Sequence, residues 1–157
     1  MSITLKRLPI GYFIKNYQCP PDTDDSFKIF ALFENNKNTT FDDISNLSVS
    51  DIAAARTSFI KFHKNAVTGR PFKEIFDGAQ FHTGHAFKYR DQTETVRRLR
   101  LVGDVRIYIY FLPNRNIVVL KTLAKRENSL SEGEKSFLED ITKKVINCSN
   151  AKLVIVS

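Results

Sequence analysis

The chain has 157 residues and carries 24 Lys and Arg against 17 Asp and Glu, a formal net charge of +7. This length suits one domain, or one domain with a terminal extension, and 42% hydrophobic residues with 13 Phe can fill a core, which excludes a wholly disordered protein. No apolar run approaches the roughly 18 residues that span a bilayer. Lys6 and Arg7 interrupt the short apolar stretch at the N-terminus, so we expect a cytoplasmic protein without a secretory signal or a membrane partner.

Residues 1–45 are expected to form a β-rich N-terminal extension, and residues 46–157 the main domain. Segments 3–17 and 26–33 are rich in β-branched and aromatic residues, which predicts two strands. This extension either adds to the main sheet or forms a small subdomain of its own.

The middle of the chain begins with a predicted helix. Ser48 or Ser50 can cap its start, apolar residues follow at helical spacing, and Gly69-Arg70-Pro71 is expected to end it. Residues 72–90 predict an irregular segment with short extended pieces.

The last third of the chain predicts an antiparallel meander and a helix. Strands are expected over residues 96–102, 105–112 and 117–124, with Gly103-Asp104 as a tight turn. Ser131 and Glu134 have capping-box spacing, which predicts a helix ending near Asn147. A short strand over residues 152–156 could close the chain. The predicted fold class is therefore α+β, an antiparallel meander with one helix before it and one after it.

The positive charge gathers in this meander. Residues 96–126 hold eight basic side chains and one acidic, a net charge of +7, whereas residues 1–50 have a net charge of −1. Because side chains alternate along a strand, Arg106, Tyr108 and Tyr110 are expected on the face opposite Ile107, Ile109 and Phe111.

The preceding strand is expected to add Arg98 and Arg100 to the same polar surface, with Lys125 and Arg126 arriving from the end of the third strand. Arginines grip phosphates and tyrosine rings stack on unpaired bases, so this surface suits single-stranded nucleic acid. A solvated sheet face without a ligand is the alternative interpretation.

The segment from Val96 to Asp140 resembles the RelE/HigB/ParE superfamily of bacterial toxins from toxin–antitoxin pairs. The resemblance rests on the runs VRRLRLVGDVRIYIYF and NIVVLKTLAKREN and on the helix that follows them. It implies a RelE-like fold, which is a small curved antiparallel sheet flanked by helices, as in microbial ribonucleases. It further implies a cytoplasmic toxin that cleaves translated messenger RNA at the ribosome as a metal-independent endoribonuclease. It also implies a cognate antitoxin protein as a partner.

The resemblance assigns roles by position. Arg106 and Arg126 are expected to act as catalytic clamps on the phosphate and its transition state. RNA-binding roles are expected for Arg98, Arg100, Lys121, Lys125, Tyr108 and Tyr110.

The general acid or base is not assigned, because RelE has a tyrosine a few residues after its Lys-Arg element and residues 128–137 contain none. Candidates for this role are Glu132, Tyr108, Tyr110, His82 and His85. Two other functions stay open: a non-catalytic RelE-fold module that binds RNA or protein, and a ParE-like toxin directed at gyrase.

His82 and His85 lie three residues apart and could supply two ligands of a metal site. No third ligand stands near them at a recognisable spacing, so an ordinary loop is favoured. We expect neither a metal ion nor another cofactor.

Overall fold

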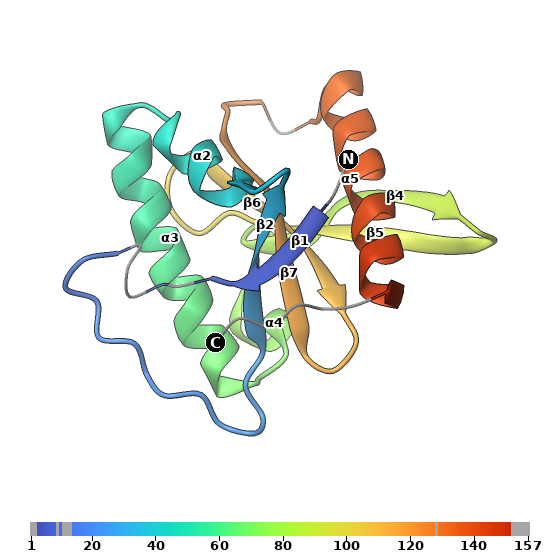
Figure 1. Ribbon diagram of the computed structural model, residues 1–157. Helices are drawn as coiled ribbons and strands as arrows, with labels where there is room; N and C mark the ends of the chain where they lie inside the picture. Colours follow the sequence, from blue (N-terminus) through green and yellow to red (C-terminus); the bar gives the residue numbers. More distant parts are fainter. Residues whose placement is uncertain (1–2, 9, 11–13, 128, 152–157) are drawn as a thin grey trace.

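The computed structural model, shown in Figure 1, describes residues 3–8, 10, 14–127 and 129–151. Its strands form one seven-stranded mixed sheet in the order β1-β2-β7-β6-β5-β4, with the short β3 paired to β2. The strands are β1 (Ile3–Arg7), β2 (Lys28–Glu34), β3 (Lys37–Asn38), β4 (Phe81–Tyr89), β5 (Gln92–Leu99), β6 (Val105–Leu112) and β7 (Asn116–Ala124). The helices are α2 (Thr39–Ser45), α3 (Val49–Thr68), α4 (Phe72–Ile75) and α5 (Glu132–Ala151). The α+β class predicted from the sequence is confirmed.

The two long helices begin where their capping residues predict. The Ser48 hydroxyl accepts a hydrogen bond from the Asp51 amide at the start of α3, and Gly69 ends the helix at a φ of +71°. At the start of α5, Ser131 and Glu134 exchange the two hydrogen bonds of a capping box, 3.1 and 2.8 Å long. Local hydrogen bonding therefore sets both starts.

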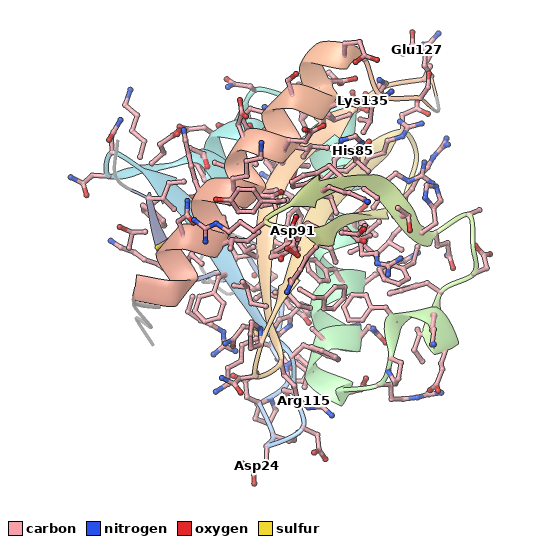
Figure 2. The ribbon with its side chains drawn as sticks, turned by 90° about the vertical axis from the view of Figure 1, so that its right-hand side faces the viewer. Asp24, His85, Asp91, Arg115, Glu127 and Lys135 are labelled. Atoms are coloured by element: carbon pink, nitrogen blue, oxygen red, sulfur yellow. The ribbon has the colours of Figure 1, made fainter. Side chains whose placement is uncertain are left out.

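Helices α3 and α5 cover opposite faces of the sheet, as Figures 1 and 2 show. Phe59 and Phe62 of α3 lie in one buried cluster with Val105, Ile107 and Ile109 of β6. Leu138 and Val145 of α5 lie in a second buried cluster on the other face. The fold therefore has three layers, and both faces of its central strands are buried.

The N-terminal strands belong to the same sheet as the meander. β2 pairs in parallel with β7 from Lys28 to Phe30, which makes the sheet mixed and not purely antiparallel as predicted. The first strand ends at Arg7, well before the predicted residue 17.

Helix α2 was not predicted. It lies against the part of β7 that follows the residues paired with β2. The Asp43 carboxylate accepts hydrogen bonds from the Thr122 amide at 3.2 Å and the Lys121 ammonium at 3.0 Å. A side chain of α2 thus satisfies a strand amide that would otherwise need a neighbouring strand.

The segment 72–90 is more regular than predicted, since it holds α4 and the nine-residue strand β4. The β4–β5 hairpin turns at Arg90 and Asp91, whose φ angles are +52° and +62°. Two-residue turns with positive φ at both positions usually carry Asn-Gly. This turn carries Arg-Asp, so the sequence has no recognisable turn signal here. β5 consequently runs from residue 92 to 99 instead of 96 to 102.

The remaining predictions for the last third agree with the structure closely. β6 has the predicted bounds, β7 begins one residue earlier than predicted, and α5 continues to Ala151, past Asn147. The strand expected over 152–156 lies outside the described residues. Over the part of the chain that the structure describes, no helix combines the length and apolarity needed to cross a membrane.

Candidate functional site

The strand β6 has the two faces that its sequence predicts. Ile107 and Ile109 belong to the cluster beneath α3, whereas Tyr108 and Tyr110 contribute to the cluster beneath α5. The expectation that the second face forms a solvent-exposed surface is wrong, because α5 packs over it. Arg106 is 0% exposed and Tyr108 is 2% exposed.

Arg106 uses its guanidinium inside the protein. Its Nη1 donates to the main-chain carbonyl oxygens of Asp104, at 2.9 Å, and Lys125. Burial and the nearby charge of Arg100 lower the pKa of Arg106. This geometry ties the turn before β6 to the end of β7, so Arg106 is a positioning residue in this structure rather than an exposed phosphate clamp.

Arg98 is also buried, with 5% of its surface exposed, but it lines a pocket. Its Nη2 donates to the Ala79 carbonyl at 2.9 Å, while its Nε has no hydrogen-bond partner among the described residues. Burial, followed by the charges of Arg106 and Arg100, lowers the pKa of Arg98. A donor that is buried without a partner, as this Nε is within the described part of the chain, costs free energy.

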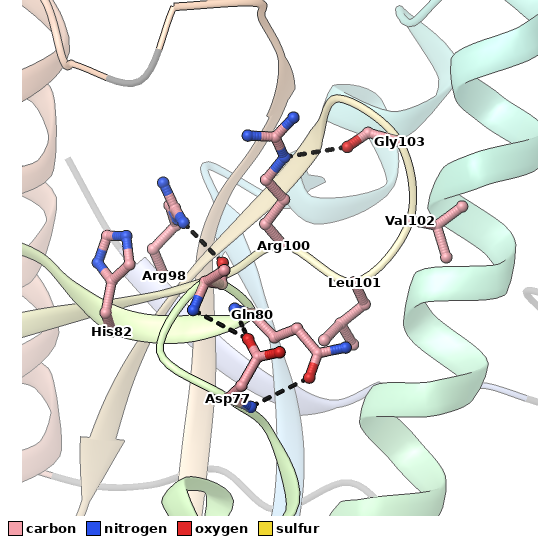
Figure 3. A pocket seen from close by; sticks show the side chains of 9 residues that line it. Asp77, Gln80, His82, Arg98, Arg100, Leu101, Val102 and Gly103 are labelled. Atoms are coloured by element: carbon pink, nitrogen blue, oxygen red, sulfur yellow. Dashed lines mark hydrogen bonds between the residues drawn. The ribbon is translucent and has the colours of Figure 1, made fainter.

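The pocket has a volume of about 530 Å³ and lies where β5 leads into the turn at residues 100–104. Figure 3 shows Arg98 and Arg100 on one wall and the turn that starts at Asp77 opposite them. The lining residues are Asp77, Ala79, Gln80, His82, Arg98, Arg100, Leu101, Val102 and Gly103. Two guanidinium groups on a hollow of this size suit an anion.

Arg100 lies after the end of β5, so it does not share a strand face with Arg98 as predicted. Its Nε donates to the Gly103 carbonyl at 3.1 Å, and its Nη2 is 3.4 Å from a carboxylate oxygen of Asp104. These contacts fold the turn back and hold the Arg100 side chain against the pocket.

The floor of the pocket is shaped by a short turn before β4. One carboxylate oxygen of Asp77 accepts hydrogen bonds from the Ala79 and Gln80 amides, both at 2.9 Å. The Gln80 side-chain carbonyl accepts from the Asp77 amide at 3.1 Å. The turn therefore fixes the backbone at Ala79, whose carbonyl oxygen holds Arg98.

His82 lies directly opposite Arg98 in the pairing of β4 with β5. Its Nδ1 is 2.7 Å from the Thr83 carbonyl oxygen. A β-bulge follows between Thr83 and His85, and a Cβ added to Gly84 would lie 3.0 Å from the Tyr108 ring. A side chain at residue 84 would require the Tyr108 ring or the strand to shift.

The other predicted RNA-binding residues do not join this pocket. Lys125 Nζ contacts a carboxylate oxygen of Glu134 at 2.7 Å, Lys121 Nζ contacts Asp43, and the Tyr110 hydroxyl donates to Glu94 at 3.0 Å. Burial and the hydrogen bond to Glu94 raise the pKa of Tyr110. Lys121 and Tyr108 instead line a second hollow at the start of α5. Arg126 is exposed in the segment between β7 and α5.

His85, the other acid–base candidate on β4, is turned toward α5. Its Nε2 is 2.7 Å from a carboxylate oxygen of Glu139, and its ring stacks on Phe87. Figure 2 shows His85 beneath that helix. Among the described residues, no three His, Cys, Asp or Glu side chains gather closely enough to hold a metal ion.

Sequence reasoning placed Arg98 and Arg100 in the site but missed the opposite wall. Asp77-Gly78 is a turn signal that could have marked the boundary before β4. No local signal could have shown that this turn folds against Arg98, because the contact joins residues 19 positions apart.

Comparisons with protein-family models, with curated proteins and with solved structures found no match to this chain.

Proposed function

We propose that this chain is a RelE-like toxin that binds single-stranded messenger RNA in the Arg98–Arg100 pocket and cleaves it as a metal-independent endoribonuclease. The observation that carries the proposal is that the side chains of Arg98 and Arg100 line the same pocket. Phosphate oxygens are among the acceptors that guanidinium groups bind most strongly.

Single-stranded RNA fits the recess better than a duplex does. Arg98 is 5% exposed, so a phosphate must enter the pocket to reach it. The backbone of a single strand can bend into such a recess, whereas the phosphates of a helix follow a fixed outer path. The same guanidinium groups would stabilise the extra negative charge that develops on the phosphate during cleavage.

The partners proposed with this activity come from the sequence resemblance. They are translated mRNA on the ribosome and a cognate antitoxin protein. The high net charge of residues 96–126 supports an anionic partner. Arg126 remains a proposed clamp from the same resemblance, and its exposed position leaves it accessible to RNA.

A second candidate function is a non-catalytic module that binds RNA or protein through the same pocket. One observation favours it. Arg106 and Lys125, which the resemblance associates with the site, are engaged by main-chain carbonyls and by Glu134. Binding through Arg98 and Arg100 would survive this arrangement even if cleavage did not.

The test compares Arg100→Gln with Arg56→Gln, a matched change at an exposed arginine on α3. The wild-type protein should cut a reporter mRNA in a bacterial translation extract. In equilibrium binding to a single-stranded oligonucleotide, Arg100→Gln should weaken affinity about tenfold and reduce the salt slope by about 0.7. Arg56→Gln should do neither.

The outcomes separate the candidate functions. Salt-dependent binding without cleavage, in the extract and with free RNA, supports the binding module. Inhibition of gyrase supercoiling with intact RNA supports a ParE-like toxin. Equal RNA affinity for wild type and Arg100→Gln would rule out the pocket as the RNA site.

A further inference from the structure

We propose that His82 is the general base of RNA cleavage in the Arg98–Arg100 pocket. This inference rests on the proposed ribonuclease function and supplies the acid–base group that the sequence leaves unassigned. Two observations support it. The His82 imidazole lines the same pocket as the two arginines, and a contact with a main-chain carbonyl sets its tautomer.

The position of His82 follows from the pairing of β4 and β5. His82 and Arg98 are direct cross-strand partners, and both line the pocket. Figure 3 shows the imidazole beside the Arg98 side chain. A phosphate held by Arg98 and Arg100 would therefore lie next to the His82 ring.

The hydrogen bond of His82 selects its tautomer. Nδ1 is 2.7 Å from the Thr83 carbonyl oxygen, which can only accept a hydrogen bond. Nδ1 must therefore carry the proton, and in the neutral imidazole Nε2 is then the unprotonated nitrogen. With Nδ1 protonated, the unprotonated Nε2 of the neutral imidazole is able to accept a proton as a general base.

The strand around Thr83 is constrained by the core. Gly84 passes against the Tyr108 ring, which is itself 2% exposed, and the β-bulge lies at this point. The carbonyl that orients His82 thus belongs to a segment held by a buried aromatic side chain.

The reaction written for this site is an internal transesterification. His82 Nε2 takes the proton from a ribose 2′-hydroxyl, and the 2′-oxygen forms a bond to the adjacent phosphorus. The bond from phosphorus to the 5′-oxygen of the next nucleotide breaks, and that oxygen takes a proton from water. The products are a 2′,3′-cyclic phosphate and a 5′-hydroxyl end, and the imidazolium returns its proton to solvent.

His85→Gln provides a matched control for His82→Gln. Both histidines are on β4, but the ring of His85 is paired with Glu139 of α5. His82→Gln should reduce the cleavage rate at least a hundredfold and leave the affinity for a 2′-deoxy oligonucleotide within twofold. His85→Gln should change neither quantity.

The pH profile gives a second readout. Arg98 and Arg100 of the pocket wall, Asp77 of the opposite turn, and Arg97 and Lys73 on the far side of His82 are the charged groups around it. The wild-type cleavage rate should rise with pH, because a general base must be unprotonated to act, and that rise should be absent from the residual activity of His82→Gln.

The result that would overturn the inference is cleavage by His82→Gln at the wild-type rate with the same pH profile. If the wild-type protein binds RNA but never cuts it, both the ribonuclease proposal and this inference fail. If Arg100→Gln abolishes cleavage and His82→Gln does not, the ribonuclease proposal stands and the role of His82 is wrong.

Discussion

At the scale of single residues, buried polar groups explain most of how the pocket is built. Arg106 connects two chain segments through their carbonyl oxygens, and Arg98 is held by Ala79. The sequence predicted correctly that Arg106 and Tyr108 share a strand face. It could not predict that this face is covered, because period-two alternation describes a strand and carries no information about which helix packs on it.

At the proposed RNA site, Asp104 would compete with a bound phosphate for Arg100. Its carboxylate lies 3.4 Å from Arg100 Nη2 in a partly exposed ion pair. Asp104→Asn removes the competing charge while keeping a side chain of the same shape, so RNA affinity should rise by about twofold to fivefold. Equilibrium binding at low salt measures the change, and equal or weaker binding would show that Asp104 helps to orient Arg100 instead.

Gly84→Ala should destabilise the fold. The added Cβ would lie 3.0 Å from the Tyr108 ring and 3.2 Å from the Arg98 Cβ, a contact that requires buried groups to move. We expect a loss of about 1–3 kcal/mol in the free energy of unfolding, measured by urea denaturation. Gly78→Ala is the control, because nothing lies within 4 Å of a Cβ added at that glycine.

His63 should make stability depend on pH. Its Nδ1 is 2.9 Å from the Tyr17 hydroxyl, and burial lowers the pKa of His63 below its usual value of 6.5, against a raising effect of Asp22. The unfolded chain therefore takes up a proton at a higher pH than the folded protein does. Stability contributed by neutral His63 is complete above about pH 6.5 and is lost as the pH falls toward the lowered folded-state pKa.

The measurement is urea denaturation of wild type and His63→Gln from pH 7.5 to 5.5. The wild-type free energy of unfolding should fall more steeply than that of the variant, by at most about 1.4 kcal/mol per pH unit. Parallel curves would mean that His63 does not contribute to the pH dependence.

At the scale of secondary structure, elements with local signals were predicted well and those without them were missed. α3 and α5 start at residues that cap them through their own side chains. α2 and β4 depend on distant contacts, such as Asp43 with Thr122, and on a turn at Arg90-Asp91 that lacks glycine. Propensity and periodicity report neither feature.

The capping box of α5 gives a prediction at this scale. Ser131→Ala removes the acceptor of the Glu134 amide and should lower the free energy of unfolding by about 1 kcal/mol. Ser131→Asp should keep most of the stability, because aspartate is an equally good cap. Because Ser131 is exposed, a loss of stability in Ser131→Ala would come from the lost cap and not from lost packing. Equal stability of all three proteins in urea denaturation would contradict this account.

At the scale of the whole molecule, the sheet is the middle layer between α3 and α5, so the same strands connect the two buried clusters. Residues of β6 alternate between the cluster under α3 and the cluster under α5. The charge of the last third is consequently divided, with Arg106 buried between layers and Arg98 and Arg100 left at the pocket. The sequence shows that this charge lies in the last third of the chain, whereas its division depends on which elements pack against each strand.

This connection predicts cooperative unfolding. Leu138→Ala in α5 and Phe59→Ala in α3 each remove a side chain that is at most 2% exposed, on opposite faces of the sheet. Each should lower the free energy of unfolding by roughly 2–5 kcal/mol. Because the shared strands transmit the loss of either layer, helix content by circular dichroism and tyrosine fluorescence should still change in one coincident transition. An earlier, separate loss of helix signal in Leu138→Ala would instead mean that α5 detaches from a sheet that stays folded, which would expose the Arg106 and Tyr108 face to solvent.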